Sequence, residues 1–498
     1  MRIVLALFIF VQINLSGQSN FNTWNFGYNN ALTFSGTEEP TQGFGPINVD
    51  EGSASISDSN GNLLFSTDGN FVFDRDGNPM PSASNIGGHF SSTQNAVIVP
   101  KPGDFEERFY FVFVVSSGGL SSANGGLSYV EIDMSLNNGL GDILSQPILI
   151  VPNVFEKVHA SMHSNGKDVW VLTFDTSTSN FYSVLVTCEG VGSQVVSEVD
   201  LEIETNQWNN ESVGMLKVSP NGQNLAMTWT VLPNFEAGLM LGDFDNMTGE
   251  IEMISSIVEN QNEISRGYGL AFSSQSQFLY WTISFSGGST LRRFDLTSAD
   301  VLSTFEDYQS LTPYAMMALQ LAPDGKIYVA RSNSFGYLSR IESPDEPNFD
   351  NINFNEQGIE LLQNSSLGLS NDWNYIPTYL PEEIQDVTFC DDSDKIIDAS
   401  IFGASSYSWN TGSTASTIEI PEEGIYNVIL NFDCFSYEVF YNVEFVSSPE
   451  YESPAELNIC PGEGVSVTVE TNSAVVWFDN DVSKSREFDS PGIYAYTV

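Results

Sequence analysis

The chain has 498 residues, and its 64 acidic and 16 basic side chains give a formal net charge of −48 at pH 7. This length allows about two to four domains. The charge excludes nucleic acid as a plausible partner, because binding it depends on clustered Lys and Arg. The acidic residues are scattered. This favours solubility in a salty exterior, with divalent-cation binding as the alternative.

The first segment has the layout of a secretory signal peptide. Arg2 precedes an unbroken apolar run from Ile3 to Val11, and small polar residues around Gly17 and Ser19 suit cleavage. The run is shorter than the ~20 residues that a membrane span needs. We therefore expect residues 1–19 to be removed and the mature protein to be secreted or held on the outer cell surface, with no transmembrane segment.

A repeated unit follows, made of a small-residue strand, a tight turn, an aromatic strand and a third strand that often ends near Asp. Its turns include Asn60-Gly61, Asn165-Gly166, Asn221-Gly222 and Asp324-Gly325. Asn-Gly and Asp-Gly accept the positive φ angles of a hairpin turn. The turns recur roughly every 45 to 60 residues, which suits one four-stranded propeller blade per repeat.

Six such units are visible between about residues 51 and 362. A seventh can be assembled from both ends, with Leu367–Ser370 as its first strand and residues 25–34 as its outer strands. This closure would leave no free sheet edge. The sequence thus predicts an all-β fold in which residues 20–381 form a seven-bladed β-propeller, with six blades as the alternative.

The chain changes character after Pro381. Trp409 is followed after fifteen residues by Gly424-Ile425-Tyr426, and Trp477 after fifteen residues by Gly492-Ile493-Tyr494. A cysteine precedes each tryptophan, at a distance of 19 residues for Cys390 and 17 for Cys460. The matched spacing predicts two immunoglobulin-like β-sandwich modules, over residues 385–447 and 455–498.

The cysteines of the modules suggest a disulfide. Cys434 follows Tyr426 by eight residues, and export makes disulfides possible, so we expect a Cys390–Cys434 bond. Two unpaired buried thiols are the alternative. The equivalent cysteine of the second module would fall beyond Val498, so we expect that module to be truncated.

Two acidic turns are candidate calcium sites. They place oxygen ligands at alternate positions before a glycine turn, as calcium loops do. Neither turn carries the closing bidentate Glu, and plain hairpin turns are the preferred interpretation. Structural calcium is the only cofactor considered. The candidate ligands are Asp58, Asn60, Asn62, Asp74, Asp76 and Asn78.

Familiar catalytic motifs are missing from the sequence. It has no GxSxG elbow, HExxH helix, P-loop or dinucleotide fingerprint, and no blade carries a sialidase-type Asp box. These absences predict a protein without catalytic residues and without enzyme activity.

The opening of the propeller region resembles large surface proteins of gliding Bacteroidota. The resemblance rests on residues 24–27, 51–58, 60–69 and 91–103, and the Trp409-Asn410-Thr411-Gly412 stretch is similar to the PKD-like or immunoglobulin-like repeats that those proteins carry downstream. It implies a surface protein of the gliding-motility type, exported by type IX secretion. It also implies a type B C-terminal sorting domain, expected in a missing part of the chain.

The main functional prediction is an exported interaction protein for adhesion, with a surface glycan or protein as its ligand. The alternatives are a carbohydrate-active propeller enzyme that uses carboxylates at the central channel, or a lectin-like glycan binder. A fold alone cannot choose among them. Two carboxylates in an axial pocket would favour the enzyme, and a channel plugged by apolar side chains would count against it.

Overall fold

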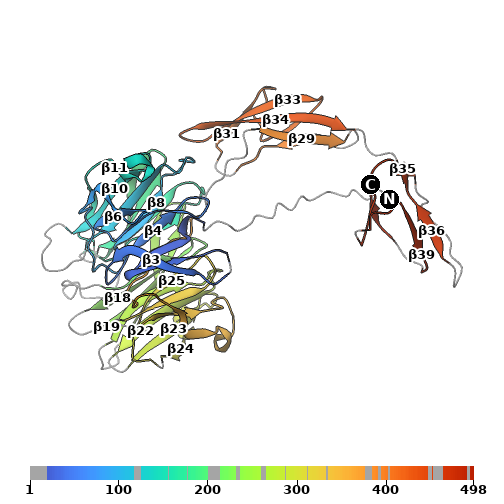
Figure 1. Cartoon of the computed structure of the whole chain (residues 1–498). Helices are drawn as coiled ribbons and strands as arrows, with labels where there is room; N and C mark the ends of the chain where they lie inside the picture. Colours follow the sequence, from blue (N-terminus) through green and yellow to red (C-terminus); the bar gives the residue numbers. More distant parts are fainter. Residues whose placement is uncertain are drawn as a thin grey trace. The chain divides into compact units, whose positions relative to one another are not determined.

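The structure is a computed structural model of the whole chain. Two compact units, Met1–Tyr379 and Leu380–Val498, are each described by themselves (Figure 1). The residues described are 19–36, 38–116, 125–154, 156–175, 178–199, 213–231, 236–259, 265–285, 288–310, 312–332, 335–375, 384–390, 394–401, 404–446, 451–452, 464–479, 481–490 and 494–498. The predicted signal peptide lies almost entirely outside them.

The first unit consists of antiparallel sheets that follow one another in chain order. Its first three sheets are β1 (Thr23–Phe26), β2 (Tyr28–Thr33) and β3 (Thr41–Asn48); β4 (Ala54–Ser57), β5 (Leu63–Thr67), β6 (Phe71–Asp74) and β7 (Pro79–Ser84); and β8 (Ala96–Pro100), β9 (Phe109–Val115), β10 (Gly126–Asp133), β11 (Asp142–Ile143) and β12 (Ile148–Pro152).

The next four sheets each have four strands. They are β13 (His159–Met162), β14 (Val169–Asp175), β15 (Asn180–Thr187) and β16 (Gly190–Glu198); β17 (Leu216–Val218), β18 (Asn224–Val231), β19 (Glu236–Asp245) and β20 (Glu250–Glu259); β21 (Ser265–Phe272), β22 (Phe278–Phe285), β23 (Gly288–Asp295) and β24 (Glu306–Gln309); and β25 (Met316–Leu321), β26 (Ile327–Arg331), β27 (Tyr337–Ile341) and β28 (Phe354–Glu360).

The only helices among the described residues are short 3-10 turns, namely η1 (Ser19–Phe21), η2 (Asn137–Gly139), η4 (Val301–Thr304) and η5 (Phe349–Asn351). None of them has the length and apolar character needed to span a bilayer.

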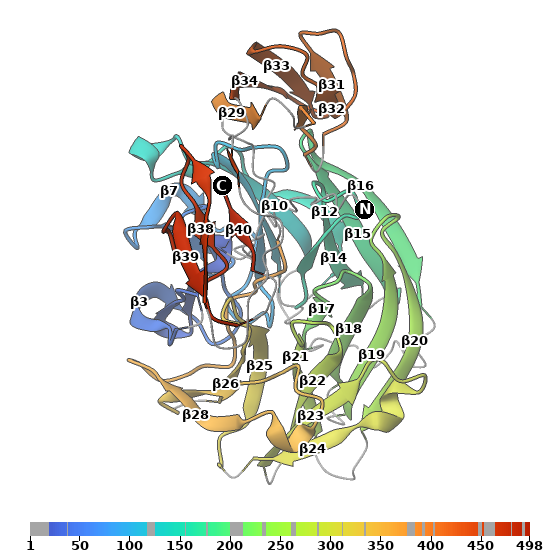
Figure 2. The same ribbon diagram turned by 90° about the vertical axis from the view of Figure 1, so that its right-hand side faces the viewer.

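The sheets succeed one another around a common centre (Figure 2). From β4 onward the first strand of each sheet contacts the first strand of the next, in the order β4, β8, β13, β17, β21 and β25. We call these six the inner strands. The fold is therefore all-β, and its four-stranded sheets are consistent with the blades of a propeller.

The predicted turns lie between inner strands and their neighbours. Gly61 joins β4 to β5 with a φ of 84°, and Gly325 joins β25 to β26 with a φ of 79°. Asn-Gly and Asp-Gly suit such turns because a residue without a Cβ adopts positive φ without strain. The hairpins that the sequence predicted at these two places are confirmed.

The two ends of the first unit meet. Trp24 of β1 packs edge-on against Tyr328 of β26, with ring centroids 5.6 Å apart. The stretch Leu367–Ser370 returns to the inner strands, where Ser370 forms a parallel bridge with Ser53 just before β4. Sheets near the start of the chain thus adjoin the last one, and the ring has no gap at this place.

The second unit begins with two sheets around one core. One sheet has the order β29 (Ile384–Cys390), β34 (Ser436–Val446), β33 (Gly424–Asn431) and β31 (Ser406–Trp409), and the other pairs β30 (Ile396–Asp398) with β32 (Thr417–Glu419). Trp409, Val428 and Val439 are buried between them. Shorter pairs follow, formed by β35 (Tyr451–Glu452), β36 (Val465–Thr468), β37 (Glu470–Thr471), β38 (Val476–Trp477), β39 (Ser485–Phe488) and β40 (Tyr496–Thr497).

The predicted duplication is visible in side-chain contacts. The indole N–H of Trp409 donates to the carbonyl of the residue six positions on at 2.8 Å, and that of Trp477 does the same at 2.7 Å. The hydroxyls of Tyr426 and Tyr494 each donate at 2.9 Å to the carbonyl four positions earlier. Matched sequence spacing therefore produces matched local structure.

The predicted Cys390–Cys434 disulfide does not fit this sheet. β29 pairs with β34 in parallel and places Cys390 opposite Val446, at the far end of β34. The opposite end of β34 is Ser436, and Cys434 lies two residues before it. Ten residues of strand span roughly 33 Å at about 3.3 Å per residue, whereas a disulfide needs Cα atoms within about 7 Å. The prediction is wrong because spacing along a sequence does not reveal which strands pair.

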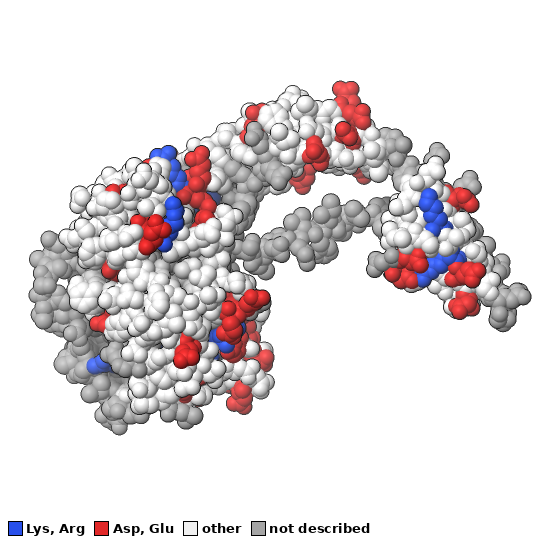
Figure 3. Space-filling view, in the orientation of Figure 1, with Lys and Arg blue, Asp and Glu red and all other residues white. Residues whose placement is uncertain are grey.

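Acidic side chains lie in small groups on the visible surface, several of them beside Lys or Arg (Figure 3). One ion pair joins distant parts of the first unit, since the Arg340 guanidinium donates to both carboxylate oxygens of Glu39 at 2.6 and 2.9 Å.

Candidate functional site

The axis of the ring is occupied by the chain itself. The amide nitrogen of Asn371 donates to the carbonyls of Ala96 and Val158, at 2.9 and 2.8 Å. Its amide oxygen accepts from the Gln94 amide at 3.0 Å and the Lys217 ammonium at 3.2 Å. One side chain thus bonds to three neighbouring sheets, which places the segment around it on the axis.

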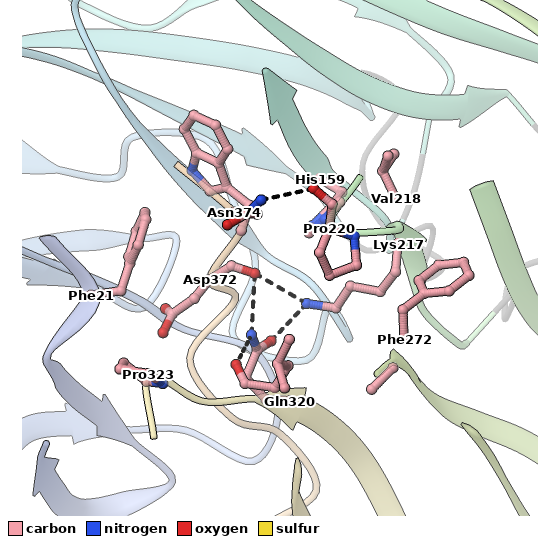
Figure 4. A pocket seen from close by; sticks show the side chains of 13 residues that line it. Phe21, His159, Lys217, Val218, Pro220, Phe272, Gln320, Pro323, Asp372 and Asn374 are labelled. Atoms are coloured by element: carbon pink, nitrogen blue, oxygen red, sulfur yellow. Dashed lines mark hydrogen bonds between the residues drawn. The ribbon is translucent and has the colours of Figure 1, made fainter. Parts of the chain in front are cut away.

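A buried acid and a buried base lie beside Asn371. The Lys217 ammonium donates to Gln320 Oε1 at 2.6 Å and to the main-chain oxygen of Asp372 at 3.4 Å (Figure 4). The Asp372 carboxylate accepts from Ser370 Oγ at 2.8 Å and from the Trp24 indole N–H. Burial lowers the pKa of Lys217 to about 7 and raises the pKa of Asp372 to about 7.

A pocket lies at the end of the axis where the inner strands finish, which we call the finishing end. Its cavity of about 50 Å³ is far below the several hundred that ligand sites fill. His159 lines it, and its Nδ1 has no partner within the described residues. Burial lowers the pKa of His159 well below its usual value. The cavity has room for a few waters. Figure 4 labels Phe21, His159, Lys217, Val218, Pro220, Phe272, Gln320, Pro323, Asp372 and Asn374 around it.

The opposite end, where the inner strands begin, is the starting end. Two glutamates lie there, Glu51 before β4 and Glu156 before β13, with only 5% and 4% of their surface exposed. Tyr268 of β21 donates its hydroxyl to Glu51 Oε1 at 3.0 Å. Thr93, before β8, donates its backbone N–H to Glu156 Oε2 at 2.8 Å and lies 3.3 Å from it through its hydroxyl.

Four sheets thus contribute to this cluster, and a fifth joins it through Gly214, whose N–H donates to Thr93 Oγ1 at 3.3 Å. Side chains from so many sheets can meet only near the ring's axis. We call Glu51, Thr93, Glu156 and Tyr268 the axial carboxylate cluster.

The surroundings of Glu51 raise its pKa. Burial, and then the neighbouring charge of Glu156, raise the pKa of Glu51 to about 8, although hydrogen bonds with Tyr268 and Ser91 oppose the shift. Burial also lowers the pKa of the adjacent Lys157 to about 8. Glu51 Oε2 is buried and has no hydrogen-bond partner within the described part of the chain. Glu51 therefore holds a proton at neutral pH.

Two neighbouring carboxyl groups can perform acid–base chemistry when one donates a proton and the other accepts one. Sequence reasoning missed this pair. Glu51 stood at the start of the stretch that carries the family resemblance, but no motif assigned it a role. The available signal was its position, since Glu51 and Glu156 each occur a few residues before an inner strand.

The predicted calcium turns are hairpin turns in the structure. Asp58 Oδ1 accepts the N–H groups of Asn60 and Asn62, at 2.9 and 2.8 Å. Asp74 Oδ1 likewise accepts those of Asp76 and Asn78, both at 2.9 Å. These carboxylates close their own turns. Among the described residues no cluster of three His, Cys, Asp or Glu side chains could hold a metal ion, and calcium at the turns stays a prediction.

No protein-family model and no curated protein matches the chain. Solved structures are similar in fold. A protein from Lactobacillus plantarum matches with 12% identity and a TM-score of 0.39, over 70% of this chain and 87% of that one. The periplasmic gluconolactonase of Pseudomonas aeruginosa matches with 14% identity and a TM-score of 0.35, over 62% and 94%. A polysaccharide lyase described as an ulvanlyase matches with 10% identity and a TM-score of 0.37, over 78% and 89%.

These similarities assign no residue and no activity to the chain. They do correct one prediction, that the protein is not an enzyme. The missing motifs were taken to exclude catalysis, yet the structures similar in fold include a gluconolactonase and a polysaccharide lyase. That prediction is wrong because a motif search detects only residues adjacent in sequence, so missing motifs do not exclude an enzyme.

Proposed function

We propose that the protein is a carbohydrate-active enzyme whose proton-transfer groups are Glu51 and Glu156 on the axis of the ring. The observation that carries the proposal is the convergence of two buried carboxyl groups at the starting end, one of which holds a proton at neutral pH. A raised pKa beside a second carboxylate is the arrangement that glycoside hydrolysis uses.

Each group has a defined part in the proposed reaction. The proton on Glu51 passes to the departing glycosidic oxygen as the bond from the anomeric carbon to that oxygen breaks. A water molecule attacks the same carbon and gives its proton to Glu156. The Tyr268 hydroxyl and the Thr93 N–H hold the two carboxyl groups in place.

The sequence analysis took a central channel plugged by apolar side chains as evidence against an enzyme. The axis is filled, but the filling around Asn371 and Lys217 is polar and hydrogen-bonded rather than apolar. A substrate would therefore meet the starting end from outside and would not thread the ring.

Reducing-end release from a panel of cellulose, xylan, mannan, β-1,3-glucan, chitin and pectate tests the proposal. We expect Glu51→Gln and Glu156→Gln to lower the rate at least about 100-fold. The control Glu250→Gln, on an exposed position of β20, should leave it unchanged. Gln variants with the full rate would contradict the assignment. Binding of a glycan without any release of reducing ends would favour a lectin-like protein instead.

The finer architecture is also a proposal. We propose seven blades, with Leu367–Ser370 completing the blade of β1 to β3. Supporting this, Asn30 of β2 donates to the carbonyl of Asn364 at 3.1 Å and accepts from the N–H of Gln363 at 3.0 Å. We propose immunoglobulin-like modules in the second unit because Tyr426 repeats the hydrogen bond of a tyrosine corner.

We further propose export of the mature chain to the cell surface. The signal-peptide pattern of residues 1–19 and the resemblance to gliding-motility proteins support this placement. Fractionation of the source cells, followed by detection of residues 20–498 outside the inner membrane, would test it. Retention of the uncleaved chain in the cytoplasm would contradict it.

A further inference from the structure

One exposed aromatic ring lies in the chain segment that carries Thr93 of the axial carboxylate cluster. The connection from β7 to β8 includes His89–Asn95, and within it Ser92, Thr93, Gln94 and Asn95 are at most 2% exposed. Phe90 is 54% exposed in the same segment. Its ring stacks on the imidazole of His89, with centroids 4.3 Å apart and planes 30° from parallel. The Phe90 ring is thus accessible at the surface, two residues before a fully buried stretch of the chain.

The backbone around Phe90 is fixed on both sides. Before it, the N–H of Gly88 donates to the carbonyl of Gly69 at 2.9 Å, at the turn between β5 and β6. After it, the N–H of Ser92 donates to the carbonyl of His89 at 3.1 Å, and the carbonyl of Ser92 accepts from the N–H of Gly52 at 3.1 Å. The exposed position of Phe90 is thus set by the fold.

The same segment supports both glutamates. Thr93 donates its N–H directly to Glu156. The carbonyl of Ser92 accepts from the N–H of Gly52, and Gly52 is the residue after Glu51. Phe90 lies three positions before Thr93, so their Cα atoms are at most about 10 Å apart. Phe90 is therefore close along the chain to the residue that bonds to Glu156.

The chemistry of this surface favours one kind of occupant. One phenyl ring backed by one imidazole is a platform for a single flat apolar face, and protein interfaces need far larger areas. A pyranose ring has such a face. The negative charges of Glu156 and Asp50, which also raise the pKa of Glu51, would repel a carboxylated or sulfated sugar. Burial lowers the pKa of His89, so the platform adds no positive charge at neutral pH.

We propose that Phe90, stacked on His89, binds the apolar face of a neutral pyranose ring and so positions the neighbouring glycosidic bond at Glu51 and Glu156. The inference rests on the proposed function, which it deepens by naming a neutral glycan as the substrate class and Phe90 as a positioning residue. Platforms of this kind are common in ligand sites, where aromatic side chains supply contact area and a few polar groups supply specificity.

The test uses the full mature chain and a series of neutral hexaoses (cello-, xylo-, manno-, laminari- and chito-) with oligogalacturonate as the acidic comparison. Affinity is measured by calorimetry and turnover by product analysis. Phe90→Ala should weaken binding and raise KM about tenfold while kcat changes less than about twofold, and Phe90→Trp should restore binding. Phe44→Ala, which removes an aromatic ring that is 70% exposed on β3, is the matched control and should change neither.

The outcomes separate the two proposals. If Glu51→Gln abolishes turnover while Phe90→Ala behaves like Phe44→Ala, the platform is wrong and the proposed function stands. If Phe90→Ala weakens binding but both Gln variants keep the full rate, the platform stands and the catalytic assignment fails. Binding of oligogalacturonate more tightly than of any neutral hexaose would overturn the substrate class, and no binding of any probe would overturn the site.

Discussion

The two ends of the ring's axis hold similar ionisable groups under opposite conditions. At the finishing end, Lys217 and Asp372 are buried, and the chain's own segment around Asn371 occupies the space beside them. At the starting end, Glu51 is equally buried, but one of its oxygens has no partner in the described structure.

This contrast separates structure from function. A buried polar group costs free energy unless it is hydrogen-bonded, so native folds satisfy nearly all of them. At the finishing end Lys217 and Asp372 follow that rule, although His159 Nδ1 beside them has no partner among the described residues. At the starting end Glu51 breaks the rule, and its raised pKa marks it as a candidate functional group. Four changes, from the largest expected effect to the smallest, test whether the ends differ in this way.

Removal of Lys217 should have the largest effect. Lys217→Met leaves the buried Asp372 and Gln320 without their charged donor, and breaking a buried pair costs about 3 to 5 kcal/mol. The urea midpoint should fall accordingly, with an unchanged m-value. Lys101→Met is the control, since Lys101 pairs with Glu131 near the surface at 3.1 Å and such pairs contribute about 1 kcal/mol or less. Equal losses in the two variants would remove the distinction between the closed end and the surface.

Loss of the Asn371 side chain comes next. Asn371→Ala removes four hydrogen bonds and leaves buried carbonyls of two inner-strand segments unpaired, so we expect a loss of about 2 to 3 kcal/mol. Asn374→Ala removes a single bond to the Pro220 carbonyl and should cost about 1 kcal/mol. Thermal unfolding of both variants measures the difference. A ring that tolerates Asn371→Ala as well as Asn374→Ala is not held together by this segment.

The sequence predicted the parts of this comparison that are local. Asn-Gly and Asp-Gly turns mark hairpins such as the one at Gly61, and Leu367–Ser370 does return beside the first inner strand. The duplicated Trp and Tyr contacts of the second unit also follow from spacing. In each case the controlling chemistry lies within a few residues of the pattern.

The axis could not be predicted, because its contacts join residues far apart in the chain. Gln94 and Asn371 are separated by 277 positions, and Glu51 and Tyr268 by 217. No periodic pattern in the sequence predicts contacts between residues so far apart. The wrong disulfide has the same cause, since the parallel pairing of β29 with β34 is a long-range event. Sequence reasoning missed Glu51 and Glu156 for the same reason, because they come from separate sheets and belong to no motif.

A third change concerns how stability depends on pH. The folded pKa of Glu51, about 8, lies above the ordinary glutamate value of 4.5, so between these values the folded state binds the extra proton. Stability contributed by that proton is present at low pH and is lost as pH rises through this window, by up to about 1.4 kcal/mol per pH unit.

Glu51→Gln should remove this downward slope, so that the variant matches the parent near pH 5 and exceeds it near pH 8. Denaturant unfolding at a series of pH values measures the slope. Asp50→Asn, at the neighbouring residue, is the control and should keep it. A parent protein whose stability does not fall over this window would show that Glu51 is ionised when folded, and would remove the proposed acid.

The smallest effect on stability is expected at Phe90, where the largest effect on binding is proposed. Phe90→Ala removes a ring that is 54% exposed and packs on one half-buried side chain, so its unfolding free energy should change by no more than about 0.5 kcal/mol. Trp373→Ala, at the finishing end, removes a buried ring whose indole N–H donates to the Ile98 carbonyl at 2.9 Å, and should cost about 3 kcal/mol or more. Circular dichroism melts of the two variants compare the ends directly. Removing a side chain that stabilises the fold lowers the unfolding free energy, whereas removing one that only binds a ligand leaves it nearly unchanged. A large loss at Phe90 would therefore make it a structural residue and erase the difference between the two ends.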